Sequence, residues 1–276
     1  MSETTHFSRR GFVLGGSALA GLAVLNSCSG GKATRGVGST LPPPTLPSPT
    51  SVPLDAAAVT TVAPAGHTGT PSAPGAGAAT YINHGDASRN NVALTFHLGG
   101  DVALVTRLLD LMKSKNFTAT FFAIGSWLEA HPSLGHRAVA DGHELANHTL
   151  NHKNMGDLTS AQLYDEIAGG GQALVPFIGS IGKWFRPSGT DVPSQKILDE
   201  AGRAGYAVSV GYDVDSRDFK EPGSKVVIAK VNSEVHSGAI VSLHFGHSGT
   251  ITALPSILDH LDVLGLKQAT VTTLLG

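Results

Sequence analysis

Apolar and polar residues alternate along residues 81–276 in a way that predicts strands separated by helices. The segment 91–98 (NVALTFHL) is typical of a buried strand, and apolar side chains then recur at helical spacing, at Val102, Val105, Leu108, Leu109 and Met112. Further apolar runs predict strands within 119–125, 143–148, 183–189, 207–215, 238–246 and 269–275. Such a chain forms a parallel sheet with helices outside it, so we expect an α/β fold in one domain.

Polar side chains stand at the ends of five of these predicted strands. They are His97, His148, Arg186, Asp215 and His244. In a parallel α/β barrel the catalytic residues lie at the carboxyl ends of the strands. We therefore expect these five groups to meet at one mouth of the domain.

The first 28 residues have the pattern of an export signal. Arg9 and Arg10 precede an apolar, glycine-rich run that ends at Leu25 and is short for a membrane-spanning helix. The pattern resembles a twin-arginine signal joined to a bacterial lipobox, in which Cys28 becomes the lipidated first residue. This predicts a lipoprotein on the outer face of the cytoplasmic membrane. The alternative is a secretory peptide cut near Ser27, which would release the protein into the cell wall.

Residues 29–80 form a predicted flexible linker between this signal and the folded part, residues 81–276. The linker holds nine of the fifteen prolines, three charged residues and no aromatic residue, so it cannot bury enough apolar area to offset chain entropy. The whole chain has a net charge of −2 and 14% charged residues, which gives no basic surface for nucleic acid. Cys28 is the only cysteine, so no intramolecular disulfide can form.

The folded part resembles a known family through segments that occur in order. They are ATFFAIGSWLEAHP, HELANHTLNH, FRPSG, DVDSRDF, IVSLH and ALPSILDHLDVLGLKQATVTTLL. Together they resemble the polysaccharide deacetylases, the carbohydrate esterase family that includes chitin and peptidoglycan N-deacetylases. The resemblance covers essentially all of residues 90–276. It implies a distorted, incomplete (β/α) barrel that forms a single catalytic domain.

The resemblance also implies roles for the residues at the strand ends. His148 and His152 match two metal ligands, and neutral imidazole suits zinc and other borderline divalent ions. Taken alone, a pair of histidines four residues apart is more often structural. Arg186 would orient the catalytic base, and His244 would be the general acid that protonates the leaving amine, with Asp215 holding it in the right charge state. The implied activity is removal of N-acetyl or O-acetyl groups from a cell-wall glycan.

The first motif departs from the family pattern, Thr-Phe-Asp-Asp-Gly, because residues 95–101 read TFHLGGD. Leu98 has no donor atom and cannot bind a metal. In one arrangement, His97 takes over as base and Asp101 supplies the missing carboxylate ligand. In a second, His97 is a third imidazole ligand and Asp101 is the base. In a third, Asp101 is only the N-cap of the following helix, and the site binds metal weakly or not at all.

Two rival functions fit the same residues. In the first, the protein binds glycan without catalysing a reaction. In the second, it keeps the metal and removes a group other than acetyl from a modified sugar. Candidate aromatic residues for the sugar groove are Trp127, Trp184, Phe219 and Phe245, of which the two tryptophans could equally be core residues. His247 has no counterpart in the family pattern, and we expect it to face solvent.

Overall fold

A computed structural model describes residues 77–276 of the chain. The predicted export signal, including Cys28, and residues 29–76 of the predicted linker lie outside the described residues. Within residues 77–276 no helix is both long and apolar enough to cross a membrane.

The strands form the predicted parallel arrangement. A main sheet has the strand order β4-β3-β2-β7-β6, β8 pairs with β2, and β1 pairs with β5, all in parallel register. Isolated bridges from Phe185 to Asn147 and to Ser209 continue the pairing from β4 toward β5, so the sheet curves into a barrel that stays incomplete. The strands are β1 (Thr80–Ile82), β2 (Asn91–Leu98), β3 (Thr120–Ala123), β4 (Glu144–Asn147), β5 (Val208–Val210), β6 (Val214–Asp215), β7 (Ile240–His244) and β8 (Lys267–Gln268).

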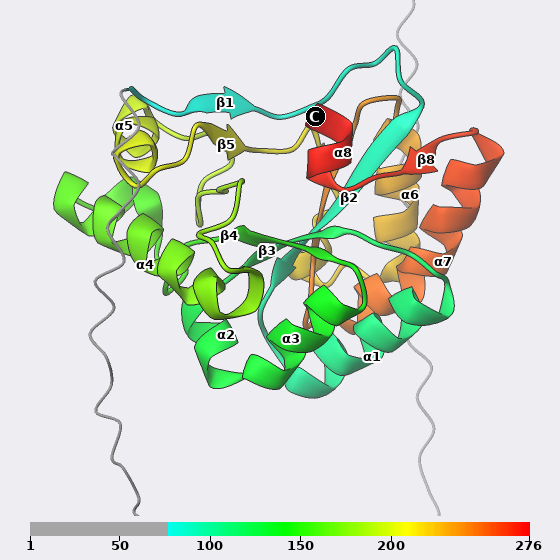
Figure 1. Cartoon of the computed structure of the whole chain (residues 1–276). Helices are drawn as coiled ribbons and strands as arrows, with labels where there is room; N and C mark the ends of the chain where they lie inside the picture. The colour runs from blue at the N-terminus through cyan, green and yellow to red at the C-terminus, as the bar shows by residue number, and fades with distance from the viewer. Residues whose placement is uncertain (1–76) are drawn as a thin grey trace, which may run out of the picture. The chain divides into compact units, whose positions relative to one another are not determined.

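Helices cover the outside of this sheet, except the short C-terminal helix, whose Val271 and Leu274 pack against interior-facing residues such as Ala93 (Figure 1). The helices are α1 (Val102–Ser114), α2 (Gly125–Ala130), α3 (Pro132–Ala140), α4 (Ser160–Ile178), α5 (Gln195–Arg203), α6 (Ser224–Glu234), α7 (Ser248–Val263) and α8 (Val271–Leu275), with 3-10 turns η1 (Met155–Asp157) and η2 (Asp218–Lys220).

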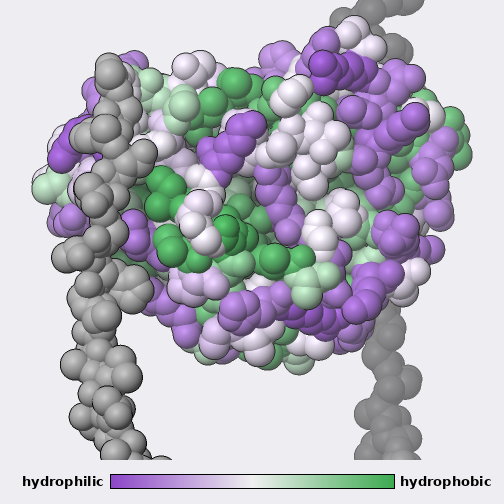
Figure 2. Space-filling model, in the orientation of Figure 1, coloured by the Kyte–Doolittle hydropathy of each residue, from purple (hydrophilic) through white to green (hydrophobic). Residues whose placement is uncertain are grey.

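On the face shown in Figure 2, apolar residues gather left of the centre and hydrophilic residues lie mainly toward the right and lower edges. The α/β barrel prediction is confirmed.

The core lies between the sheet and the helices. Helix α1 buries four of its five predicted apolar positions and leaves Val102 exposed. Along β2, side chains alternate between two faces. Phe96 and Leu98 belong to the same buried cluster as the apolar side of α1, whereas Thr95 and His97 point to the barrel interior, where they meet Arg186.

Three strand predictions need correction. The segment 269–275 forms helix α8 from Val271 onward, after the two-residue strand β8, because the Thr270 hydroxyl accepts a hydrogen bond from the Thr273 amide and caps the helix. Residues 183–189 contain no strand beyond the bridges at Phe185. The segment 207–215 splits into β5 and β6.

Candidate functional site

Four of the five predicted strand-end groups line one cavity of about 380 Å³. Asp215 and Asp101 do not line it. The residues around the cavity are His97, His148, His152, Arg186, Pro187, Gly189, Thr190, Asp191, Tyr212, Phe219 and His244.

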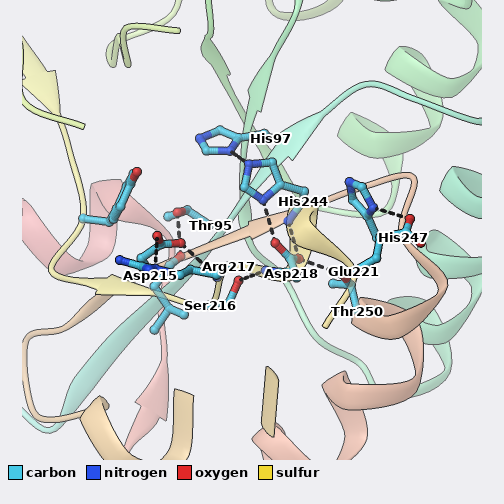
Figure 3. Close-up of polar contacts among 12 residues, drawn as sticks. Thr95, His97, Asp215, Ser216, Arg217, Asp218, Glu221, His244, His247 and Thr250 are labelled. Atoms are coloured by element: carbon cyan, nitrogen blue, oxygen red, sulfur yellow. Dashed lines mark hydrogen bonds and ion pairs between the residues drawn. The ribbon is translucent and has the colours of Figure 1, made fainter. Parts of the chain in front are cut away.

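A chain of hydrogen bonds runs through the cavity wall. His97 and His244 are directly opposite each other in the paired strands β2 and β7, and His97 Nδ1 lies 2.6 Å from His244 Nε2. His97 Nε2 lies 3.2 Å from a terminal nitrogen of Arg186. His244 Nδ1 lies 2.7 Å from a carboxylate oxygen of Asp218 (Figure 3).

The donor and acceptor of each hydrogen bond in this series can be assigned, starting from Arg186. A guanidinium only donates, so His97 Nε2 accepts from Arg186 and the His97 proton is on Nδ1. His97 therefore donates to His244 Nε2, and His244 donates from Nδ1 to Asp218. Every ring nitrogen of the two histidines is engaged, which leaves neither ring a free lone pair in this arrangement.

Asp218, and not Asp215, is the carboxylate that holds His244, so the prediction for Asp215 is wrong. Asp218 also accepts hydrogen bonds from the His244 amide at 2.8 Å and the Thr250 hydroxyl at 2.6 Å. Asp215 instead accepts from the Arg217 amide and pairs with the Arg217 side chain at 3.4 Å. The chain turns through a left-handed residue at Arg217 (φ 53°), which brings Asp218 beside β7. Burial disfavours the charged carboxylate, but the bonds from His244 and Thr250 outweigh it and lower the pKa of Asp218.

His148 and His152 lie in the loop after β4, not on a helix. Their rings are 4.9 Å apart and inclined at 70°. His148 Nδ1 donates to the Arg186 carbonyl at 2.9 Å, which leaves Nε2 as the unprotonated nitrogen. Such a bond from the far nitrogen is the usual support of a metal-ligating imidazole.

The buried imidazoles are held neutral. Burial, with further repulsion from neighbouring rings, holds the pKa values of His97 and His148 well below 6.5, and partial desolvation lowers the pKa of His152, which is exposed at the cavity. At neutral pH the rings of His148 and His152 are therefore available as metal ligands, whereas both nitrogens of His97 are already engaged.

Arg186 is buried without a paired carboxylate among residues 77–276. It donates to the carbonyls of Val210 and Gly211 at 3.0 and 2.9 Å and to the Thr95 hydroxyl at 3.0 Å. Its guanidinium carbon lies 3.8 Å from the ring centre of Phe122. Burial lowers the pKa of Arg186 to about 9, so the guanidinium remains charged at neutral pH.

The donor set fits a divalent ion through two imidazoles, those of His148 and His152. His97 is stacked on His148, with ring centres 4.3 Å apart and planes 11° apart, so their in-plane lone pairs run parallel and cannot converge on one ion. Leu98 is buried in the core. Within residues 77–276 no group of three His, Cys, Asp or Glu side chains is placed to hold a metal.

Asp101 is the N-cap of α1. Its carboxylate accepts from the Leu104 amide at 2.9 Å. The preceding Gly100 has φ of 92°, and a β-carbon there would lie 3.2 Å from the Gly246 Cα, so this turn packs closely on the loop after β7. The structure therefore has the third of the predicted arrangements for Asp101, and neither the ligand nor the base position expected in the other two.

Replacing Asp101 with alanine is expected to lower the free energy of unfolding by about 1 kcal/mol, because one amide of α1 loses its partner. Metal binding should not change, and asparagine at this position should restore the stability because it caps equally well. Urea unfolding and elemental analysis measure both effects. Loss of bound metal in Asp101→Ala would show that the carboxylate is a ligand after all.

Sequence reasoning missed Tyr212 and Asp191 in the cavity wall. The Tyr212 hydroxyl donates to an Asp191 carboxylate oxygen at 2.6 Å, and burial raises the pKa of Tyr212. The rule that polar groups gather after parallel strands could have found Tyr212, which follows β5 by two residues. The cavity is also lined by Phe219, which is 45% exposed and lies 5.1 Å from the His244 ring.

The other aromatic candidates and His247 lie away from the cavity. Trp184 and Phe245 are core residues, and the Trp127 indole donates to the Gly100 carbonyl. His247 pairs with Glu221 at 3.0 Å, as drawn in Figure 3.

Comparisons with known proteins agree with the fold and the motifs. The family model for polysaccharide deacetylase matches residues 84–209. A peptidoglycan-N-acetylglucosamine deacetylase of Bacillus cereus is 32% identical over 188 residues, which cover 67% of this chain and 87% of that protein. The chain belongs to the polysaccharide deacetylase family. A chitooligosaccharide deacetylase of a Bradyrhizobium species is also 32% identical, over 60% of this chain and 75% of that one.

Solved structures of polysaccharide deacetylase relatives include a pseudoenzyme. The structure of a family 4 carbohydrate esterase (CE4) pseudoenzyme from Bacillus anthracis matches with a TM-score of 0.66 and 26% identity, over 71% of this chain and 69% of that one. A mutant of the same protein with restored enzymatic activity matches equally well, at 27% identity. Members of the polysaccharide deacetylase family are metal-dependent hydrolases of acetyl amides, and this fold also occurs in a protein without activity.

Proposed function

We propose that this chain is a hydrolase that removes N-acetyl, or O-acetyl, groups from a cell-wall glycan such as peptidoglycan. The observation that carries the proposal is the convergence of His97, His148, His152, His244 and Arg186 on one cavity at the carboxyl ends of the strands. The curated relatives act on N-acetylated glycans, as their names state.

A divalent ion, which we propose is zinc, would be held by His148 and His152. Both rings are neutral at neutral pH and inclined to each other, and the Arg186 carbonyl fixes the tautomer of His148. When bound, such an ion supplies Lewis acidity at the acetyl carbonyl.

In this proposal His244 transfers the proton, and His97 controls access to its Nε2. When the His97 ring turns away from His244, Nε2 of His244 becomes free to take a proton from the attacking water. The hydroxyl of that water joins the acetyl carbon and the bond from this carbon to nitrogen breaks. The proton then passes from Nε2 to the leaving nitrogen, which gives acetate and a free amine. Asp218 keeps Nδ1 of His244 protonated throughout, and Arg186 keeps His97 in one tautomer.

The proposed setting is the cell envelope. The signal in residues 1–28 would direct export of the chain and lipidation of Cys28. Residues 29–80 would then tether the domain to the outer face of the cytoplasmic membrane. The alternative of release into the cell wall would place the same domain near the same substrate.

A second candidate is a glycan-binding protein without catalysis. Two observations favour it: Leu98, which stands at the sequence position of a family metal ligand, has no donor atom and is buried in the core, and the hydrogen bonds from Arg186 to Asp218 leave no free lone pair on His97 or His244. The likeness to a pseudoenzyme from Bacillus anthracis points the same way.

Acetate release from N-acetylated glycan separates the two candidates. The wild-type domain with zinc should release acetate, and Asp218→Asn should lower the rate by about 10²–10⁴-fold, because His244 loses the carboxylate that fixes its tautomer. Asp215→Asn is the matched control, since this neighbouring carboxylate does not contact His244, and it should retain the wild-type rate. Equal losses in the two variants would contradict the assigned role of Asp218. Glycan binding without acetate release would favour the second candidate.

A further inference from the structure

The loop that presents His148 and His152 has an uncommon backbone. Thr149 and His152 both have positive φ, at 67° and 55°, although neither is glycine. Such conformations persist only where the surrounding structure holds them. The Thr149 hydroxyl accepts from the His152 amide at 3.2 Å, which accounts for one of these supports.

Asn147 and Ser188 also hold Thr149, and a buried carboxylate on helix α4 supports the residues that flank His152. Glu166 is 2% exposed. It accepts from the Asn151 backbone amide at 2.8 Å and from the Asn151 side chain at 2.9 Å, and it pairs with Lys153 Nζ at 2.8 Å. The Glu166 backbone carbonyl also accepts from the Leu150 amide. Glu166 therefore holds the residues on both sides of His152.

No other part of the described domain makes a hydrogen bond or ion pair to this carboxylate. Burial of a charged group costs free energy, and here only groups of the histidine loop compensate for that cost. The bonds from Asn151 and Lys153 outweigh burial and lower the pKa of Glu166, so it is ionised at neutral pH.

We propose that Glu166 is a positioning residue that fixes the Asn151–Lys153 segment and thereby holds His152 beside His148. The inference rests on the proposed function only in naming a metal as what this pair receives. The placement of the loop itself does not depend on the metal.

The test compares Glu166→Gln with Glu200→Gln in the full chain. Glu200 is a suitable control because it is also a buried helical carboxylate, 6% exposed, but it pairs with Arg203 on its own helix. In the metal-free protein, amide hydrogen exchange at Asn151, His152 and Lys153 should become at least tenfold faster in Glu166→Gln and stay unchanged in Glu200→Gln. Zinc affinity should fall about 10–100-fold in Glu166→Gln alone, the effect typical of losing a residue that supports a metal ligand.

The two readouts keep this inference separate from the proposed function. Faster exchange confined to the loop supports the positioning role even if the wild-type protein binds no zinc, a result that would count against the proposed function only. Unchanged exchange at these three amides would overturn the inference, whatever the activity. So would equal changes in Glu200→Gln, because they would show a general effect of removing a buried charge.

Discussion

Arg186→Ala is expected to lower the free energy of unfolding by about 3–5 kcal/mol, because it leaves several buried acceptors without a donor. The carbonyls of Val210 and Gly211 and the Thr95 hydroxyl all receive hydrogen bonds from this one side chain. The substitution also opens a cavity beside Phe122. The loss should exceed that of an ordinary ion pair because three structural elements depend on one guanidinium.

Urea unfolding at pH 7 measures this loss. Arg89→Ala is the control, since Arg89 is an exposed arginine with only surface contacts, to Gly276 at 3.3 Å and to Asp86 at 4.0 Å, and its loss should stay within about 0.5 kcal/mol. In Arg186→Ala, His97 Nε2 also loses its donor, so nitrogen NMR should show a mixture of His97 tautomers. A change in unfolding free energy below about 1 kcal/mol would contradict the structural role assigned to Arg186.

Stability should also fall steeply as the pH drops from 7 to 5. His143 and His148 are buried and His97 is half-buried; desolvation holds all three neutral and lowers the pKa of His143 to about 4. A histidine whose folded pKa lies below its unfolded value of about 6.5 stabilises the fold in full above pH 6.5. That contribution is lost as the pH falls toward the folded pKa, since only the unfolded chain then takes up the proton.

The expected size follows from the number of such groups. Each contributes a loss of about 1.4 kcal/mol per pH unit below 6.5, so His143 alone accounts for about 3 kcal/mol by pH 4. Unfolding free energies from urea titrations at pH 7, 6 and 5 give the slope. His143→Gln keeps an acceptor for the Ala119 amide and does not titrate. It should therefore reduce the slope of unfolding free energy against pH by the contribution of one proton, about 1.4 kcal/mol per pH unit. A flat profile between pH 7 and 5 would show that these imidazoles are not held neutral.

The sequence predicts the architecture and most of the site because both follow from periodic patterns. Alternating strand and helix patterns give a parallel sheet, and such a sheet brings the carboxyl ends of its strands together. His97 and His244 meet for this reason, although they are 147 residues apart in the sequence. The motifs then indicate the family, and the comparisons confirm it.

Features that depend on local backbone conformation could not be predicted from the sequence. The choice between Asp215 and Asp218 depends on a single left-handed residue between them, which no periodicity reveals. Residues 269–275 contain a β-branched run with strand propensity, but the cap by Thr270 and burial of Val271 and Leu274 make it a helix. Glu166 contacts loop residues that lie 13 to 15 positions away in the sequence. Such contacts depend on how helix α4 packs against the loop, which a local sequence pattern does not reveal.

The central claim is that an acetyl-glycan hydrolase operates here although both aspartates of the usual first motif are absent. The most direct test is the rate of acetate release from N-acetylated peptidoglycan fragments by the zinc-loaded wild-type chain beside His148→Ala. The account predicts release by the wild type and loss of both zinc and acetate release in the variant. No acetate above the rate of the variant, with zinc present and the chain folded, would contradict it.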